Sequence, residues 1–188
     1  FLFATLDTKG HEADFVREHL LAQGQDVVLV DTGCLADPQV ACDIDREQLF
    51  SVAGVSLHEL VSRADRGEAV SAAARGAAQI ARQAHADGQL SAVFGLGGSA
   101  GTTIATAAMR QLPLGVPKVM VSTLASGDVR GFVGVRDITL INSVVDISGL
   151  NRISRTVLHN AAAALAGMLQ HRPTARHERD KPLIAATM

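Results

Sequence analysis

The sequence predicts an α/β domain with helices on both faces of an open, mostly parallel sheet. Short apolar runs of strand length alternate with longer segments whose apolar residues recur at helical spacing, which is the pattern of buried parallel strands joined by crossover helices. The apolar run within 92–106 ends in glycines and hydroxyl residues, as expected for a strand that leads through a tight turn into a helix. A chain of 188 residues can bury a substantial core. We therefore expect one Rossmann-like domain over residues 1–170.

The first half of the chain predicts a β-α-β unit. Residues 1–6 and 26–31 are apolar runs of strand length, and a helix is expected between them, ending near Gln23. Parallel strands joined in this way require a right-handed crossover. Between residues 32 and 66 the periodicity is lost except for a short helix near 57–62, so we expect a long excursion of the kind that forms lids or interface arms.

The second half continues the alternation and then changes character. Residues 68–86 predict an alanine-rich helix suited to close packing on a sheet or on a partner helix. The elements expected after it are a strand at 92–94, a helix to about Gln111, strands at 118–122 and 138–141, and a helix with an apolar stripe from Ile153 to Met168. The charged, proline-containing stretch 171–180 predicts a linker, and 181–188 is typical of the first strand of a second domain.

The glycine loop after the third predicted strand is the first candidate for a binding site. It contains four glycines and three hydroxyl residues, namely Gly95, Gly97, Gly98, Gly101, Ser99, Thr102 and Thr103. Glycines allow positive φ and let a ligand approach the backbone closely. The hydroxyls can cap the following helix or bind a ligand, while the free N–H groups and the dipole of the helix start favour a phosphate or a carboxylate.

This loop departs from the familiar phosphate-binding motifs. A P-loop has a lysine after its last glycine, whereas Gly101 is followed by Thr102. The spacing Gly95-x-Gly97-x-x-Ala100 fits the loose dinucleotide pattern, but the next strand ends in Ser122 and Thr123, with no acidic residue to hold a ribose. The pattern favours a phosphate or nucleotide site over a nicotinamide site. A plain strand-to-helix turn that needs glycine only for packing is the alternative.

Three segments are expected to meet at the carboxyl edge of the sheet, where ligands of open α/β sheets bind. Their candidate binding residues are Asp7, Thr8 and Lys9, then the glycine loop, then Ser122, Thr123, Ser126, Gly127 and Asp128. Lys9 suits a terminal phosphate, and Asp128 or Asp7 suits a magnesium ion. Further phosphate candidates are Arg66, Arg130, Arg136 and Arg152. His11 is the histidine nearest to the expected cleft, but no catalytic residue is evident, so the sequence does not decide whether the domain is an enzyme.

Composition narrows the range of partners and compartments. A net charge of −2 and the absence of Trp and Tyr offer neither attraction to a polyanion nor large rings for base stacking, so no nucleic acid or membrane partner is expected. No apolar run approaches the roughly 18–20 residues that span a bilayer. Cys34 and Cys42 lack the spacing of a zinc site and predict two reduced thiols. We expect a cytoplasmic protein.

Four motifs together resemble a known family. They are Ala4-Thr-Leu-Asp-Thr-Lys-Gly10, Gly95-Leu-Gly-Gly-Ser-Ala-Gly-Thr102, Pro117-Lys-Val-Met-Val-Ser-Thr-Leu-Ala-Ser-Gly-Asp128 and Ser143-Val-Val-Asp-Ile-Ser-Gly-Leu-Asn-Arg-Ile-Ser154. In this order they are similar to the amino-terminal domain of the tomato mosaic virus resistance protein family. The resemblance implies an ATP-binding domain, with magnesium accompanying the nucleotide, and a second domain that begins near Lys181. It places the glycine loop and the turn 7–9 in the site, followed by Asp128 and Asn151-Arg152. Ala100 stands where that family's loop is expected to have glycine.

Three hypotheses follow. In the first, the domain binds ATP and couples that binding to its own second domain or to a subunit interface. In the second, it is half of an enzyme that acts on a phosphorylated or acidic metabolite, and the second domain completes the site. In the third, the helix 68–86 and the excursion before it pack against another copy, which gives a homodimer or a higher homo-oligomer.

Overall fold

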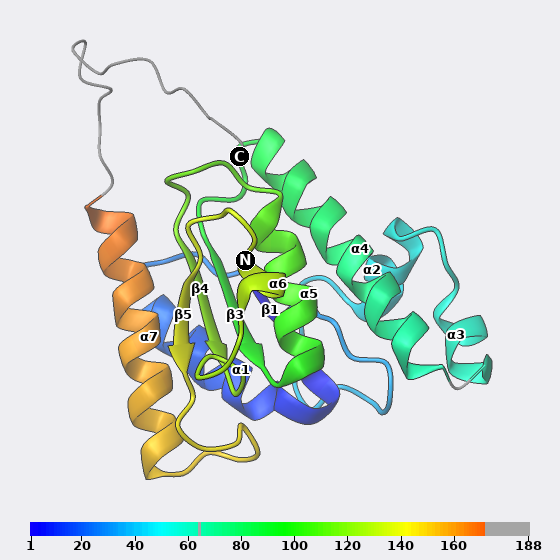
Figure 1. Cartoon of the computed structure of the whole chain (residues 1–188), viewed down its shortest axis with the longest axis horizontal. Coiled ribbons are helices and arrows are strands. Elements are labelled where there is room, and N and C mark those ends of the chain that lie inside the picture. The colour runs from blue at the N-terminus through cyan, green and yellow to red at the C-terminus, as the bar shows by residue number, and fades with distance from the viewer. Residues whose placement is uncertain (64, 172–188) are drawn as a thin grey trace.

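A computed structural model describes residues 1–63 and 65–171 and confirms the predicted α/β fold (Figure 1). The strands are β1 (Leu2–Ala4), β2 (Leu29–Asp31), β3 (Val93–Gly97), β4 (Lys118–Ser122) and β5 (Thr139–Asn142). The helices are α1 (Leu6–Ala22), α2 (Arg46–Val52), α3 (Leu57–Arg63), α4 (Arg66–Ala86), α5 (Ser99–Arg110), α6 (Arg130–Val133) and α7 (Arg152–Gln170). The expected strand at 181–188, and all of the expected linker except its first residue, lie outside the described residues.

The five strands form an all-parallel sheet in the order β2-β1-β3-β4-β5. The chain moves outward from β1 to β2, returns through α4 to β3 on the other side of β1, and then continues outward to β5. The order therefore switches direction between β1 and β3, where Leu2 pairs with Phe94 and Phe3 pairs with Gly95. In sheets of this order, ligands bind outside the carboxyl ends of the strands at that switch.

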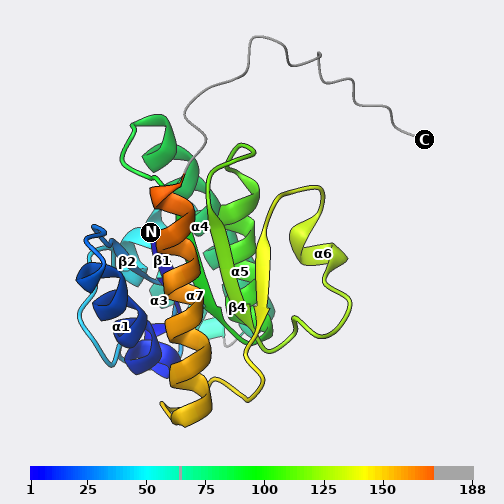
Figure 2. The same ribbon diagram turned by 90° about the vertical axis from the view of Figure 1, so that its left-hand side faces the viewer.

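Each face of the sheet has its own core, because successive strand residues point to opposite faces. On one face Phe3 and Val93 pack with α4, α5 and the buried side chains of α2. On the other face Leu2 and Phe94 pack with α1 and α7. Figures 1 and 2 show this three-layer arrangement, with α1 and α7 on one side and α4 and α5 on the other. Helices on both faces explain why the strands consist of continuous apolar runs.

The alanine-rich helix α4 packs against other elements of the same domain. Its buried residues are Ala69, Ala72, Ala73, Gly76, Ala77, Ala81 and Ala84. These small side chains let α4 approach α5 and α2 closely; a Cβ atom added at Gly76 would lie 3.1 Å from Cγ of Leu49 in α2. Asp65 caps the helix by accepting a hydrogen bond from Glu68 N, which sets its start.

Some local predictions differ from the structure, and β2, for example, spans Leu29–Asp31 where residues 26–31 were expected. The first strand is shorter than residues 1–6, because Thr5 becomes the N-cap of α1 and the helix begins at Leu6. Residues 7–9 therefore lie in the first turn of a helix, with a kink at Lys9 (φ −131°, ψ 19°). The excursion also contains α2, which the periodicity does not predict; a capping box between Asp45 and Gln48 fixes its start.

The approach of α5 to the sheet generates a stability prediction. A Cβ atom at Gly95 would lie 2.8 Å from Sδ of Met120 and closer still to Cβ of Ala105. Gly95→Ala should therefore lower the free energy of unfolding by about 1–3 kcal/mol, measured by urea denaturation. The matched control is Gly167→Ala in α7, where an added Cβ meets no atom within 4 Å. This control should be neutral or stabilising by up to about 1 kcal/mol, since alanine favours helix. Equal stability of the two variants would contradict the close packing.

Candidate functional site

A pocket of about 240 Å³ opens at the carboxyl edge of the sheet, beside the switch between β1 and β3. Four segments form most of its wall: the start of α1, the turn at 32–35 after β2, the first two turns of α4, and the start of α5. Asp146 adds a carboxylate from the loop after β5. The pocket thus joins segments that lie up to about 140 residues apart in the sequence.

The buried carboxylate of Asp31, at the end of β2, holds three parts of this edge together. Its Oδ1 accepts hydrogen bonds from Leu6 N at 3.1 Å and Gly33 N at 2.8 Å. Its Oδ2 accepts from Arg46 Nε at 2.7 Å, and Arg46 Nη1 in turn donates to the carbonyl of Ala36. Two walls of the pocket, the start of α1 and the turn at 32–35, are therefore fixed to the same carboxylate.

Asp7 also fixes the turn at 32–35 to the start of α1. Its Oδ2 accepts hydrogen bonds from the backbone N–H groups of Cys34 at 3.1 Å and Leu35 at 2.8 Å. A Cβ atom at Gly33 would lie 2.7 Å from the Asp7 carboxyl carbon, so the close approach requires glycine there. Asp7 lines the pocket as predicted, but its hydrogen bonds give it a structural role in the turn at 32–35.

The start of α5 forms the pocket wall that carries free backbone N–H groups. Gly98 is the N-cap, makes no side-chain cap, and is followed by a first turn without an acidic residue. The first N–H groups of a helix have no partner within the helix, and no side chain caps them here. Thr102 Oγ1 donates back to the Gly98 carbonyl at 2.7 Å, and Thr103 Oγ1 donates to the Ser99 carbonyl at 2.9 Å. Both predicted hydroxyls therefore bond within the helix, and neither residue lines the pocket.

The four loop glycines divide into two groups. An added Cβ atom at Gly97 would lie 3.0 Å from Gly101 Cα, and one at Gly101 would lie 2.9 Å from the Leu96 carbonyl oxygen. Gly97 also has φ +153°, and Gly95 contacts α5 as described above. Packing therefore accounts for three of the four, which is the alternative that the sequence left open. Gly98 has room for a Cβ atom, whose nearest neighbour would be Thr123 Oγ1 at 3.6 Å, and together with Gly101 it lines the pocket.

Two cationic side chains line the pocket from different walls. Lys9 comes from α1 and Arg66 from the start of α4. Neither forms an ion pair with another residue in the described part of the chain. Of the four arginines proposed from the sequence, Arg66 is the one that lines the pocket, from the first residue of α4.

The third predicted segment does not join the pocket wall. Ser122 is buried, and its hydroxyl shares a 2.7 Å hydrogen bond with Thr102 Oγ1 and accepts one from Leu124 N at 3.0 Å. Asp128 is exposed and paired with Arg130 at 2.6 Å, a hydrogen bond that holds the pKa of its carboxyl below the usual value. The predicted residues absent from the wall are Gly95, Gly97, Thr102, Thr103, Ser122, Thr123, Ser126, Gly127 and Asp128. Those present are Asp7, Thr8, Lys9, Gly98, Ser99 and Gly101.

Sequence reasoning also missed pocket residues. Thr32, Gly33, Cys34 and Leu35 follow β2 in a segment without a recognisable binding pattern. Asp146 follows β5 and lies in the motif 143–154 that carries the family resemblance, but it was not proposed as a site residue. The one available signal was that strands of a parallel sheet all end at the same edge, which makes every strand-end loop a candidate. His11 is exposed and does not line the pocket. Among residues 1–63 and 65–171, no cluster of three His, Cys, Asp or Glu side chains is suited to hold a metal ion.

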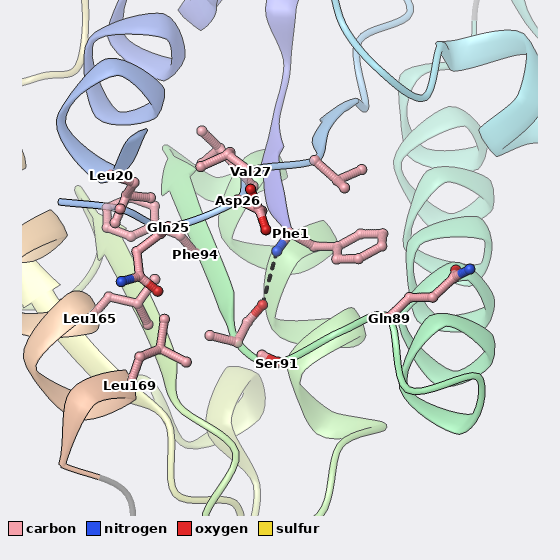
Figure 3. Close-up of a pocket in the computed structure, with 14 residues that line it drawn as sticks. Phe1, Leu20, Gln25, Asp26, Val27, Gln89, Ser91, Phe94, Leu165 and Leu169 are labelled. Carbon is pink, nitrogen blue, oxygen red and sulfur yellow. Dashed lines mark hydrogen bonds between the residues drawn. The ribbon is translucent and has the colours of Figure 1, made fainter. Parts of the chain in front are cut away.

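A second pocket, of about 270 Å³, lies at the opposite, amino edge of the sheet (Figure 3). Leu20, Val27, Phe94, Leu165 and Leu169 contribute apolar side chains to it, and the amino group of residue 1 donates to the Ala92 carbonyl at 2.9 Å beside it. Within residues 1–63 and 65–171, no lysine or arginine lines it. Position and charge both favour the pocket at the carboxyl edge as the candidate site.

The strand order and the helices on both faces define a doubly wound, Rossmann-like α/β domain. The chain belongs to the uncharacterised protein family UPF0261: the model of that family's N-terminal domain matches residues 1–174. A UPF0261 protein of Clostridium tetani is 44% identical over 188 residues, and UPF0261 protein RA0729 of Rhizobium meliloti is 46% identical over the same length. The ToMV resistance protein Tm-1(GCR237) of Solanum lycopersicum is 35% identical over 185 residues.

These relatives are longer than the chain. All 188 residues match the two bacterial relatives and span 46% of each, whereas the match to the tomato protein covers 90% of this chain and 24% of that protein. The chain thus covers about half the length of its bacterial relatives, which fits the expectation of a second domain. No helix in the described ranges has the length and apolarity needed to cross a membrane.

The environment of the two thiols generates a pH prediction. Burial raises the pKa of the Cys34 thiol above its ordinary value of 9.0, and the Asp7 carboxylate raises it further. Burial likewise raises the pKa of the Cys42 thiol. A raised pKa leaves little reactive thiolate at neutral pH. Iodoacetamide should therefore alkylate both thiols slowly at pH 7, with rates that still increase beyond pH 9, followed for each thiol by mass spectrometry. A Cys34 rate that levels off below pH 8 would contradict this environment.

Proposed function

We propose that the domain binds a phosphate-bearing ligand, with ATP as the first candidate, in the pocket between the ends of β1 and β3. The observation that supports the proposal most strongly is the uncapped start of α5 in a pocket that also contains two cations without ion-pair partners in the described ranges. Free N–H groups and the helix dipole favour an anion at that point.

The charges around the pocket support a ligand with several negative groups. Lys9 would act as a point charge on a phosphate, whereas Arg66 presents a planar fork that can bind two phosphate oxygens. The carboxylate of Asp7 is engaged with two backbone N–H groups, which offset its charge.

Magnesium would accompany a nucleotide through its phosphates, because this ion prefers one or two carboxylates together with phosphate oxygens and water. The carboxylates that line the pocket are Asp7 and Asp146. Asp128, the sequence-based candidate, is paired with Arg130 away from the wall. We therefore propose Asp146, which is exposed, as the carboxylate that faces a magnesium ion brought by the ligand.

A second candidate is a smaller phosphorylated or acidic metabolite. The volume of about 240 Å³ favours it, since ligand pockets usually measure about 300–1,000 Å³. In this case the second half of the protein would complete the site, as proposed for an enzyme built from two domains. Coupling of ligand binding to the second domain or to another copy of the chain is part of the same proposal.

A charge placed at the start of α5 tests the proposal. An aspartate at position 100 would stabilise the helix by about 0.3–1 kcal/mol but would repel an anion beside it. Ala100→Asp should therefore weaken the binding of ATP with magnesium by at least about tenfold, measured by isothermal titration calorimetry, without lowering the melting temperature.

The matched control is Ala100→Asn, which has nearly the same shape and no charge and should retain most of the affinity. Inorganic phosphate, AMP and GTP complete the titrations: selectivity for adenine and for the triphosphate supports ATP, whereas similar affinity for all of them favours the metabolite. Equal ATP affinity of the two variants, or no saturable binding of any phosphate compound by the unmodified protein, would overturn the proposed site.

A further inference from the structure

Glu12 is a buried carboxylate that the proposed function leaves unused. It lies in α1, is 2% exposed, and forms no ion pair with another residue of the described ranges. Its Oε1 accepts a hydrogen bond of 2.6 Å from the backbone N–H group of Gly149, which lies 137 residues further along the chain. Burying a carboxylate is costly unless it is hydrogen-bonded, so the bond to Gly149 offsets part of the cost of placing Glu12 here.

Gly149 belongs to the loop 143–151, which joins β5 to α7 at the carboxyl edge of the sheet (Figure 1). The same loop contributes Asp146 to the pocket wall. Ile147, the next residue, is buried in the core that contains side chains of α1 and α7. Asp146 is therefore followed at once by two anchor points, Ile147 and Gly149, and the second of these depends on Glu12.

The backbone of this loop adopts conformations that need support. Val144 has φ +67°, which is unfavourable for a β-branched residue, and Gly149 has φ +87°. The hydroxyl of Ser143 donates to the Val145 carbonyl at 2.6 Å on one side of Val144, and Glu12 holds the N–H group of Gly149. Conformations of this kind persist where the surrounding contacts determine them. Loss of such a contact should let the loop relax away from its position.

Glu12 also connects this loop to a cationic wall of the pocket. Lys9 lies three residues before Glu12 in α1 and lines the same pocket as Asp146. A phosphate that carries a magnesium ion would meet the lysine and the carboxylate at once, so the separation of the two side chains determines how well it fits. The hydrogen bond between Glu12 and Gly149 joins the two segments that carry them.

We propose that Glu12 is a positioning residue, which acts through Gly149 to hold Asp146 where it faces the magnesium ion of a bound phosphate ligand. The inference rests on the proposed phosphate site and adds what controls its carboxylate wall. Glu12 does not line the pocket, so it acts on the ligand only through the loop. Loss of Glu12 should therefore remove the benefit of magnesium and spare the binding of the phosphates themselves.

Substitutions at both ends of the hydrogen bond test the proposal. Glu12→Ala removes the acceptor, whereas Glu12→Gln keeps an acceptor oxygen on a side chain of nearly the same shape. Gly149→Ala strains the φ of +87°, although the added Cβ atom would meet no atom within 4 Å. The matched control is Glu18→Ala, at an exposed glutamate of the same helix that does not line the pocket.

Two measurements follow the loop and the ligand separately. Hydrogen exchange of the Gly149 amide, followed by NMR without ligand, reports the bond itself. This exchange should be faster by about tenfold in Glu12→Ala and close to that of the unmodified protein in Glu12→Gln and Glu18→Ala. Calorimetric titration with ATP, once in magnesium and once in EDTA, gives the gain in affinity that magnesium provides.

The unmodified protein, Glu12→Gln and Glu18→Ala should bind ATP more tightly in magnesium than in EDTA. Glu12→Ala and Gly149→Ala should lower this gain by about three- to tenfold, with unchanged affinity in EDTA, and so should Asp146→Asn. The double variant Glu12→Ala/Asp146→Asn should lower it no further than Asp146→Asn alone, because the two residues act through one contact with the ligand. If Glu12→Ala does not fold, Gly149→Ala supplies the same comparison.

An equal loss of affinity in magnesium and in EDTA would give Glu12 a general structural role and overturn the proposal. Additive losses in the double variant, or an unchanged gain from magnesium in Glu12→Ala, would also overturn it. ATP binding by the unmodified protein without any gain from magnesium would overturn the role of Asp146 and this inference but leave the phosphate site. Absence of ATP binding in both conditions would overturn the phosphate site as well.

Discussion

The hydrogen bonds to the buried carboxylate of Asp31 are the interaction on which the candidate site depends. Asp31 ends β2, yet it accepts from the first residue of α1, from the turn at 32–35 and from Arg46. Removing one partner of a buried ion pair leaves an uncompensated charge and typically costs about 3–5 kcal/mol. Here the loss would also release two walls of the pocket from each other. Even so, Arg46 Nη2 is buried without a partner in the described ranges, so the network is not saturated.

The order of elements was predictable because each strand is a continuous apolar run and each long helix has a periodic apolar face. The glycine loop was predictable because it follows one of these apolar runs and precedes a helix, but its chemistry was predicted only in part. Gly95, Gly97 and Gly101 satisfy close contacts between β3 and α5, which a sequence cannot distinguish from a need for ligand approach. Likewise, the sequence favours Thr102 as a helix cap or ligand donor, but in the folded domain its hydroxyl bonds to Gly98 and Ser122. Local patterns identify the donors, and tertiary packing decides which of them remain free.

The residues that sequence analysis missed reach the pocket through long-range folding. Cys34 and Leu35 are placed by hydrogen bonds to Asp7. Neither contact leaves a periodic signal, because the bonded residues are 27 and 28 positions apart in the sequence. The segment 122–128 does not line the pocket: Ser122 is buried and shares a hydrogen bond with Thr102, and Asp128 is exposed and paired with Arg130.

The short pairing between β1 and β3 has a mechanical consequence. It joins the two halves of the sheet through two paired positions, whereas β3 and β4 share five. The contact also closes a loop of about ninety residues, which makes it costly to form early in folding. The pocket has one wall from α1 and another from α5, on either side of this seam. A ligand held by both walls acts as a clamp across the seam, so its occupancy would appear first as slower unfolding, with less effect on the rate of refolding.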